Sequence, residues 1–290
     1  MGIFPNAMDH LTYYGLREEP FSIMPLTNFY YHNEQHDQAM LRLSRAVEGM
    51  MGLAVLVGDI GTGKTLLARR LLENLPDDKF EVSLLVVLHA DVTSEWLIKR
   101  VSAQFGIVDE GASKVDLIGR LYDRLVEIHE EGRRAVILID EAHMLRQRET
   151  LEEIRGLLNL ELPDSKLLSF VMFGMPELDA CLENDSALKQ RTAVRYRLKN
   201  FSPEVLVDYV NFRISHAGGE SQIFSADAFE EIYELTNGNP RMVNVLCDNA
   251  LFEGFIRKAE LPLGAEVIRS VGEDLGLPLI NPAIEATERR

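Results

Sequence analysis

The stretch GDIGTGKT, residues 58–65, decides the fold. An apolar run (53–57) precedes it and an amphipathic run (64–75) follows it, so a buried strand leads through a glycine-rich turn into a helix. Glycines let several backbone N–H groups point inward, and the start of a helix carries partial positive charge. Lys64 adds a full positive charge at the same place. This stretch therefore predicts a turn that holds phosphate groups.

The same stretch fits the pattern G-x-x-x-x-G-K-[ST] in the strand-to-helix context that the pattern requires, which predicts a P-loop that binds ATP with Mg2+. Lys64 is expected to contact the terminal phosphates, and the hydroxyl of Thr65 is expected to bind Mg2+. The predicted nucleotide contacts in this segment are Gly58, Ile60, Gly61, Thr62, Gly63, Lys64, Thr65 and Leu66. A glycine-rich turn with an incidental lysine is the alternative interpretation.

A second apolar run, residues 135–139, ends in two adjacent carboxylates, Asp140 and Glu141. With a P-loop upstream, this arrangement indicates a Walker B strand. Asp140 is then expected to hold hydrated Mg2+, and Glu141 to act as the general base that polarises the attacking water. Alternatively, the two acids stabilise the dipole of a following helix. The pairing with the P-loop favours ATP hydrolysis.

Strand-like and amphipathic runs alternate along the first two-thirds of the chain, which is the pattern of an α/β domain with a parallel sheet. Strands are predicted near 53–57, 82–89, 134–139, 167–173 and 194–198, with helices near 64–75, 94–105, 113–131, 149–159 and 176–189. Beyond these, only helical periodicity remains, at 204–217, 226–236, 240–259 and 263–275. We therefore predict an α/β P-loop ATPase with five parallel strands sandwiched by helices, followed by a small all-helical lid.

The predicted divisions are an N-terminal segment (1–50), an ATPase core (51–200), a helical lid (201–276) and a flexible tail (277–290). The chain has 290 residues and a net charge of −16, and this acidity opposes a sequence-independent grip on nucleic acid. Its two cysteines, Cys181 and Cys247, lack metal-ligand spacing and are expected to be reduced thiols. No apolar stretch approaches the ~20 residues that span a bilayer, so we expect a cytoplasmic protein.

Two basic features stand out against this acidity. Five basic residues and no acidic one lie between Lys189 and Lys199, and alternation places Arg195, Arg197 and Lys199 on one face of a short strand. Near the C-terminus, the segment NGNPR at 237–241 is expected to begin a long helix, with an asparagine cap followed by a proline in the first turn.

The beginning of the chain provides a family resemblance. Residues 13–22 read YYGLREEPFS and are followed by Pro25 and by NFYY at 28–31, which resembles the opening of the GspA/ExeA family of AAA+ ATPases. The resemblance covers about residues 10–275. It continues through the P-loop, DEAH at 140–143, FGMPEL at 173–178, QR at 190–191, GNPR at 238–241 and LCD at 246–248.

The resemblance implies roles for residues outside the P-loop and the Walker B strand. The N-terminal segment is expected to cover the adenine, with Phe21 in its pocket. Pro240 is expected among the nucleotide contacts, and Arg241 is expected to reach the γ-phosphate of its own subunit as a sensor-2 arginine. A surface arginine after a loop is the alternative interpretation of Arg241.

A further arginine is expected to act in trans on the nucleotide of a neighbouring subunit. Arg191 is favoured over Arg195, and Arg197 also stays open. The alternative is that all three belong to the solvated face of an edge strand.

Two residues depart from the family pattern. The usual asparagine at the end of the second strand is His89, and the usual glutamine after Gly174 is Met175. The resemblance implies a sensor-1 function at this position, in which a side-chain amide polarises water. Methionine has no such amide, which weakens the expected function. His89 is expected either to contact Glu141 or to be an ordinary half-buried histidine.

The resemblance implies an ATP-driven factor that forms a homo-oligomer, such as a ring, a hexamer or a filament, and helps assemble a cell-envelope machine through a protein partner. Secretion channels, pili and polysaccharide exporters are such machines. Family members often carry a membrane span and a peptidoglycan-binding module; we expect neither here, so the inner membrane would be reached only through a partner. Two alternatives stay open: a DNA-associated regulator of the TniB/MuB type, and a scaffold that binds nucleotide without hydrolysis.

Overall fold

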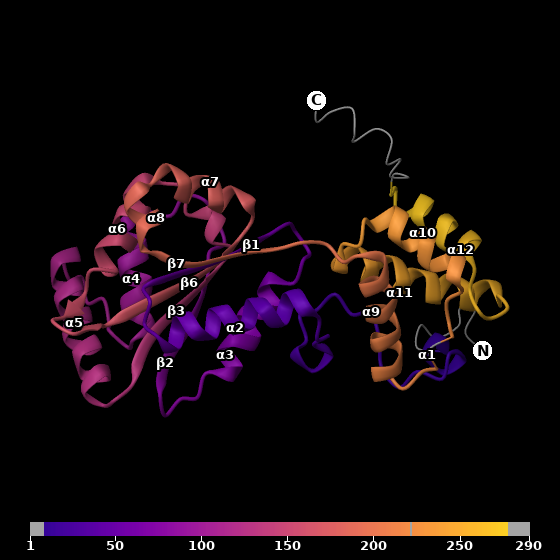
Figure 1. The fold of residues 1–290 in the computed structure, drawn as a ribbon, viewed down its shortest axis with the longest axis horizontal. Helices are drawn as coiled ribbons and strands as arrows, with labels where there is room; N and C mark the ends of the chain where they lie inside the picture. The colour runs from indigo at the N-terminus through magenta and orange to yellow at the C-terminus, as the bar shows by residue number, and fades with distance from the viewer. Residues whose placement is uncertain (1–8, 221, 278–290) are drawn as a thin grey trace. The chain divides into compact units, whose positions relative to one another are not determined.

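The computed structural model describes residues 9–220 and 222–277, which belong to two compact units (Figure 1). The sheet unit comprises residues 34–60 and 64–198. Among the described residues, the helical unit comprises those before Glu34, those from Lys199 onward, and the short turn 61–63.

The sheet unit contains five parallel strands in the order β2-β3-β6-β1-β7. Their bounds are β1 Leu53–Gly58, β2 Phe80–Val86, β3 Arg134–Asp140, β6 Leu168–Gly174 and β7 Thr192–Leu198. Every residue of β1 is buried, because β6 and β7 flank it and helices cover both faces. The predicted five-stranded parallel sheet is confirmed.

Helices lie against both faces of this sheet (Figure 1). Alternate residues of β1 (Leu53, Val55 and Val57) belong to one hydrophobic core with α4 Ser94–Gln104, α5 Lys114–Glu130, α6 Arg148–Leu157, α7 Pro176–Asn184 and α8 Ser186–Arg191. The remaining helices, α2 Glu34–Glu48 and α3 Lys64–Asn74, contact β1 and β6. A 3-10 turn (η2, Ala142–Met144) follows β3, and a short antiparallel pair, β4 Glu161–Leu162 with β5 Ser165–Lys166, precedes β6.

The structure differs from the predicted elements at several boundaries, and two of these differences have a clear local reason. The helix predicted over 176–189 is two helices, because Asp185 accepts hydrogen bonds from the backbone N–H groups of Ala187 and Leu188 and so caps a new helix, α8. The second strand begins and ends earlier than predicted, at Phe80 and Val86, because the chain leaves the sheet there and Leu88 is 82% exposed.

The helical unit is built around α9 Pro203–His216, α10 Ala226–Thr236, α11 Pro240–Arg257 and α12 Ala265–Asp274. Its hydrophobic core also includes side chains from the N-terminal segment, which contributes α1 Asp9–Tyr13 and the 3-10 turn η1 Thr27–Phe29. The predicted helical C-terminal region is confirmed. No helix in the described parts of either unit is both long and apolar enough to cross a bilayer.

A buried cation fixes the N-terminal segment inside the helical unit. The guanidinium of Arg213 is 5% exposed and donates hydrogen bonds to the backbone oxygens of Pro20 and Ser22. It also lies over the ring of Phe29, 4.6 Å from the ring centroid. Burial lowers the pKa of this guanidinium. The segment around residues 20–29 is therefore held by contacts to α9 that are distant in sequence.

Candidate nucleotide site

The predicted P-loop lies at the carboxyl end of β1, where the strand passes through residues 59–63 into α3. Gly61 and Gly63 have φ angles of 84° and 98°. These left-handed values are accessible to glycine at little cost and strained for residues with a side chain. The turn therefore depends on glycine at these two positions.

Lys64 begins α3 with its side chain turned back over the loop. Its ammonium group donates hydrogen bonds of 2.8 Å to the backbone oxygens of both Gly58 and Asp59, and the residue is 7% exposed. Burial lowers the pKa of Lys64, while the nearby carboxylates of Glu141 and Asp140 oppose that shift. The arrangement keeps a positive charge at the turn where phosphates are predicted to bind.

The two predicted Mg2+ ligands meet at the edge of the sheet. The Thr65 hydroxyl donates a hydrogen bond of 2.7 Å to Oδ2 of Asp140, which is 1% exposed. The other carboxylate oxygen, Oδ1, accepts a 2.9 Å hydrogen bond from the backbone N–H of Glu141. A hydroxyl and a carboxylate are hard oxygen ligands of the kind that Mg2+ prefers, so this pair fits the ion.

Glu141 adopts a left-handed backbone conformation, with φ 56° and ψ 32°, between β3 and η2. Its side chain is 41% exposed, whereas that of the neighbouring His143 is 3% exposed. The His143 Nδ1 atom lies 3.3 Å from Oε2 of Glu141, within ion-pair distance, although the two groups are not oriented for a hydrogen bond. The predicted general base thus has a buried imidazole beside it.

His143 belongs to the DEAH segment of the family resemblance, which predicts no role for it. The sequence signal for its contact with Glu141 is the Glu-x-His spacing, because a tight turn brings residues two positions apart close together. The sequence predicts that His89 either contacts Glu141 or is half-buried. The structure instead has it exposed, with its ring centroid 6.1 Å from that of Trp96.

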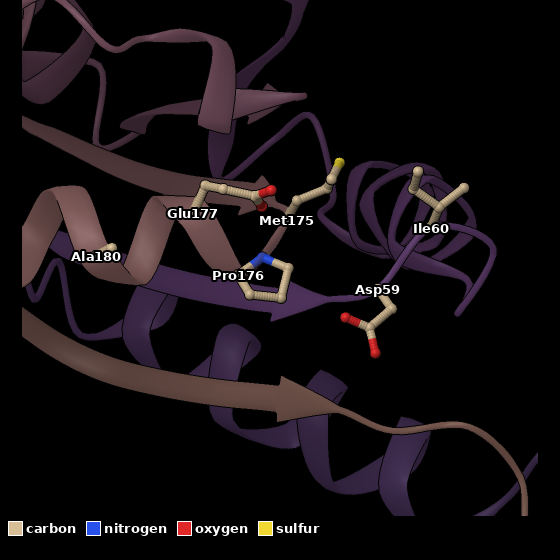
Figure 2. Close-up of a pocket in the computed structure, with 6 residues that line it drawn as sticks. All are labelled: Asp59, Ile60, Met175, Pro176, Glu177 and Ala180. Carbon is tan, nitrogen blue, oxygen red and sulfur yellow. The ribbon is translucent and has the colours of Figure 1, made fainter. Parts of the chain in front are cut away.

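Met175 follows β6 and precedes α7, where Gly174 allows a close approach to η2. A side chain at Gly174 would place its Cβ 3.0 Å from the backbone nitrogen of His143. Figure 2 shows Met175, Pro176 and Glu177 at the start of α7, beside the loop that follows β1. The hollow at this place has a volume of about 620 Å3 and is lined by Asp59, Ile60, Met175, Pro176, Glu177 and Ala180.

The P-loop lies at the carboxyl ends of the strands, and Arg191 lies at their amino ends. It immediately precedes β7, whose first residue pairs with Leu53 at the start of β1, whereas Gly58 at the other end pairs with Leu198. A strand rises about 3.3 Å per residue, so the two ends of β1 are roughly 16 Å apart. Arg191 donates hydrogen bonds to Oδ1 of Asn159 (3.0 Å) and to the backbone oxygen of Ala187 (3.2 Å).

The other two candidate arginines lie on β7, which is an edge strand. Arg195 forms ion pairs with Asp179, at 3.3 Å, and with Glu183. Arg197 is exposed, and its side chain has no hydrogen bond or ion pair with any residue that the structure describes. The structure therefore does not bring the three candidates together at one site.

Four further predicted residues belong to the helical unit. Asn239 caps α11 by accepting hydrogen bonds from the backbone N–H groups of Arg241 and Met242, with Pro240 in the first turn. Arg241 is exposed at this helix start. Phe21 is 1% exposed and lies in the hydrophobic core of the unit, with its ring 6.4 Å from that of Phe224.

Comparison with known proteins places this geometry among known sequences and folds. Residues 49–182 match the AAA domain family. Over 248 residues the chain is 35% identical to General secretion pathway protein A of Aeromonas hydrophila, an alignment that covers 84% of this chain and 45% of that protein. The chain therefore spans less than half the length of this relative.

Solved structures with a similar fold include the ORC1 protein of Aeropyrum pernix in complex with DNA. It has a TM-score of 0.64 and 18% identity, with 89% of this chain and 69% of that one covered. The ORC2 protein of the same organism, in ADPNP–ADP complexes, has a TM-score of 0.61 and 15% identity, with 85% and 71% covered. At these identities the likeness shows a shared fold and nothing more.

Proposed function

We propose that this chain, which belongs to the AAA domain proteins and resembles the GspA/ExeA family, binds ATP with Mg2+ and hydrolyses it to ADP and phosphate. One observation carries the proposal: Lys64, Thr65 and Asp140 come together at the carboxyl edge of the sheet. A buried ammonium beside a hydroxyl–carboxylate pair is a combination that recognises a metal–triphosphate. The match of residues 49–182 to the AAA domain supports it independently.

The residues divide the work of hydrolysis. Lys64 would exchange its two backbone partners for phosphate oxygens and stabilise their charge. Thr65 and Asp140 would hold Mg2+, which neutralises charge on the β- and γ-phosphates when it is bound. Glu141 would accept a proton from the attacking water, and His143 would restrict the orientation of the Glu141 carboxylate.

We further propose that turnover requires a second copy of the chain. Arg191 lies at the amino ends of the strands, whereas the P-loop lies at their carboxyl ends. It is therefore better placed to contact the nucleotide of a neighbouring chain than that of its own. Its hydrogen bonds to Asn159 and Ala187 hold it in a defined position, as a group acting on a transferring phosphoryl requires. Phe21, Pro240 and Arg241 are proposed nucleotide contacts on the strength of the resemblance alone.

The partner proposal rests on the relative named for the general secretion pathway. We propose that nucleotide-dependent assembly of this chain acts on a protein of a cell-envelope machine such as a secretion system. The alignment covers 45% of that relative, so the proposed role is limited to the part of that protein that this chain resembles.

The test is steady-state ATP hydrolysis per subunit, measured against protein concentration with and without duplex DNA. We expect a rate per subunit that rises with concentration and is indifferent to DNA, because each site is completed by a neighbour. The Lys64→Ala variant should bind no ATP at concentrations that saturate the parent. A rate that stays low until DNA is added would replace this proposal with a DNA-associated regulator, and saturable ATP binding without turnover under all conditions would leave a nucleotide-controlled scaffold.

A further inference from the structure

The sheet unit contains a second pocket, which none of the residues proposed for the ATP site lines. It has a volume of about 480 Å3 and lies between α6 and the break that separates α7 from α8. Its lining includes Arg146, Arg148, Arg155, Cys181, Asn184 and Ser186. Three arginines around one pocket stand out in a chain whose net charge is −16.

Arg155 is the residue that points to a ligand. It is half-buried on α6, yet its side chain forms no hydrogen bond or ion pair with any residue in the described part of the chain. The five N–H donors of its guanidinium are therefore available to a bound anion.

The other two arginines have donors to spare. Arg146 uses Nε for a 3.3 Å hydrogen bond to the backbone oxygen of His143, which leaves its terminal nitrogens free to bind a ligand. Arg148 pairs through Nε with Glu152 at 3.0 Å, and its side chain is 87% exposed, so water screens that pair strongly. Both guanidinium groups can therefore turn toward a ligand at little cost.

The carboxylates of the pocket do not cancel these charges. Oδ1 of Asp185 is occupied by the backbone N–H groups of Ala187 and Leu188, which it caps. Glu152 is the other acidic residue of the lining, and it is the exposed partner of Arg148. Three guanidinium groups thus face two carboxylates that are already engaged.

We propose that this pocket binds a small phosphate-bearing anion. Guanidinium groups match phosphate oxygens with paired, charge-assisted hydrogen bonds, and the volume lies within the range of small-molecule sites. The hydroxyl of Ser186 and the amide of Asn184 supply neutral donors on the opposite wall. The site is separate from the P-loop and does not depend on ATP hydrolysis.

The binding test is isothermal titration calorimetry with inorganic pyrophosphate, at low ionic strength and without Mg2+. It uses the Lys64→Ala chain as parent, so that the P-loop does not compete for the probe. We expect about one site per chain, with Kd raised roughly tenfold or more by Arg155→Gln, because a hydrogen bond to a charged group is lost. Arg120→Gln, which removes an exposed arginine of α5, should leave Kd unchanged.

A second measurement needs no substitution and locates the site. Cys181 lines the pocket and is half-buried, whereas Cys247 is fully buried and burial raises its pKa, so iodoacetamide should modify Cys181 first. Pyrophosphate should slow that modification in the unaltered chain.

Three results would overturn the proposal: no heat of binding in the Lys64→Ala chain, equal Kd for Arg155→Gln and its parent, or a Cys181 modification rate indifferent to pyrophosphate. Protection of Cys181 by a hexaglutamate peptide but not by pyrophosphate would also overturn it, in favour of an acidic peptide as the ligand.

Discussion

The sheet unit and the helical unit each bury a cation, and they use it differently. In the sheet unit, the Lys64 ammonium is bonded to two carbonyl oxygens of its own turn. In the helical unit, the Arg213 guanidinium is bonded to carbonyl oxygens of Pro20 and Ser22, 193 and 191 residues away in sequence. Both cations have pKa values lowered by burial.

The difference lies in what else faces the cation. Carboxylates of Asp140 and Glu141 act on Lys64, and the Thr65 hydroxyl lies beside them, so the group can exchange partners when a charged ligand arrives. Around Arg213 the neighbours are aromatic rings, including Phe29 and Tyr209, together with fixed carbonyl oxygens. Burial of a charge therefore does not by itself indicate a ligand site; the chemistry of its partners does.

The largest effect should come from the sheet unit, with Glu141→Gln. An amide cannot accept the proton of water, so turnover should fall by about 10²–10⁴-fold. ATP affinity should be retained because Lys64, Thr65 and Asp140 are unchanged. Steady-state hydrolysis and equilibrium nucleotide binding measure the two quantities, with Glu149→Gln on α6 as the control. If Glu141→Gln hydrolysed ATP at the parent rate, the Glu141 carboxylate would have only a structural role, like the guanidinium of Arg213.

The second-largest effect should come from the amino ends of the strands, where Arg191 lies, and not from the P-loop at their carboxyl ends. Arg191→Ala should lower turnover by about 10²–10³-fold while ATP binding persists, because one donor to the transferring phosphoryl group is lost. Mixing Arg191→Ala with Glu141→Gln should restore part of the turnover, since one chain supplies the arginine and the other the base. If mixtures of the two inactive chains stay inactive, Arg191 serves only its own fold through Asn159 and Ala187.

Within the helical unit, Gly238→Ala should lower the free energy of unfolding by about 2–4 kcal/mol, a core-type clash combined with a strained backbone. Gly238 has a φ of 65°, and a Cβ there would lie 2.1 Å from the backbone oxygen of Phe201. Urea denaturation followed by circular dichroism measures the change.

The matched control is Gly156→Ala in α6, where an added Cβ meets nothing within 4 Å. Alanine should stabilise that helix by about 0.5–1 kcal/mol. If Gly238→Ala and Gly156→Ala had the same free energy of unfolding, the close approach of residues 201 and 238 would not be needed for the fold.

The smallest expected loss is that of Arg213→Met, which keeps the bulk of the side chain and removes the charge. The carbonyl oxygens of Pro20 and Ser22 lose their donors, and the unfolding free energy should fall by about 1–3 kcal/mol. Hydrogen exchange by mass spectrometry should show faster exchange across residues 20–29. Arg257→Met, on the exposed side of α11, should leave that segment unchanged; equal protection in both variants would argue against Arg213 as the fixing contact.

Local patterns in the sequence determined much of this molecule. The runs around residues 53–57 and 134–139 predicted buried parallel strands, and the glycine-rich turn predicted the strand-to-helix transition. The Asn239 cap and the proline after it predicted the start of α11. These features depend on neighbours within a few residues, through side-chain period, backbone freedom and capping, so the order of residues alone specifies them.

Tertiary structure decided what depends on residues far apart in the chain. β6 lies between β3 and β1, and its pairing with β1 joins residues more than a hundred positions apart. The arginine pocket exists because the break at Asp185 between α7 and α8 lies beside α6. Long-range packing selects among conformations that the local sequence allows almost equally, and no local pattern carries that choice.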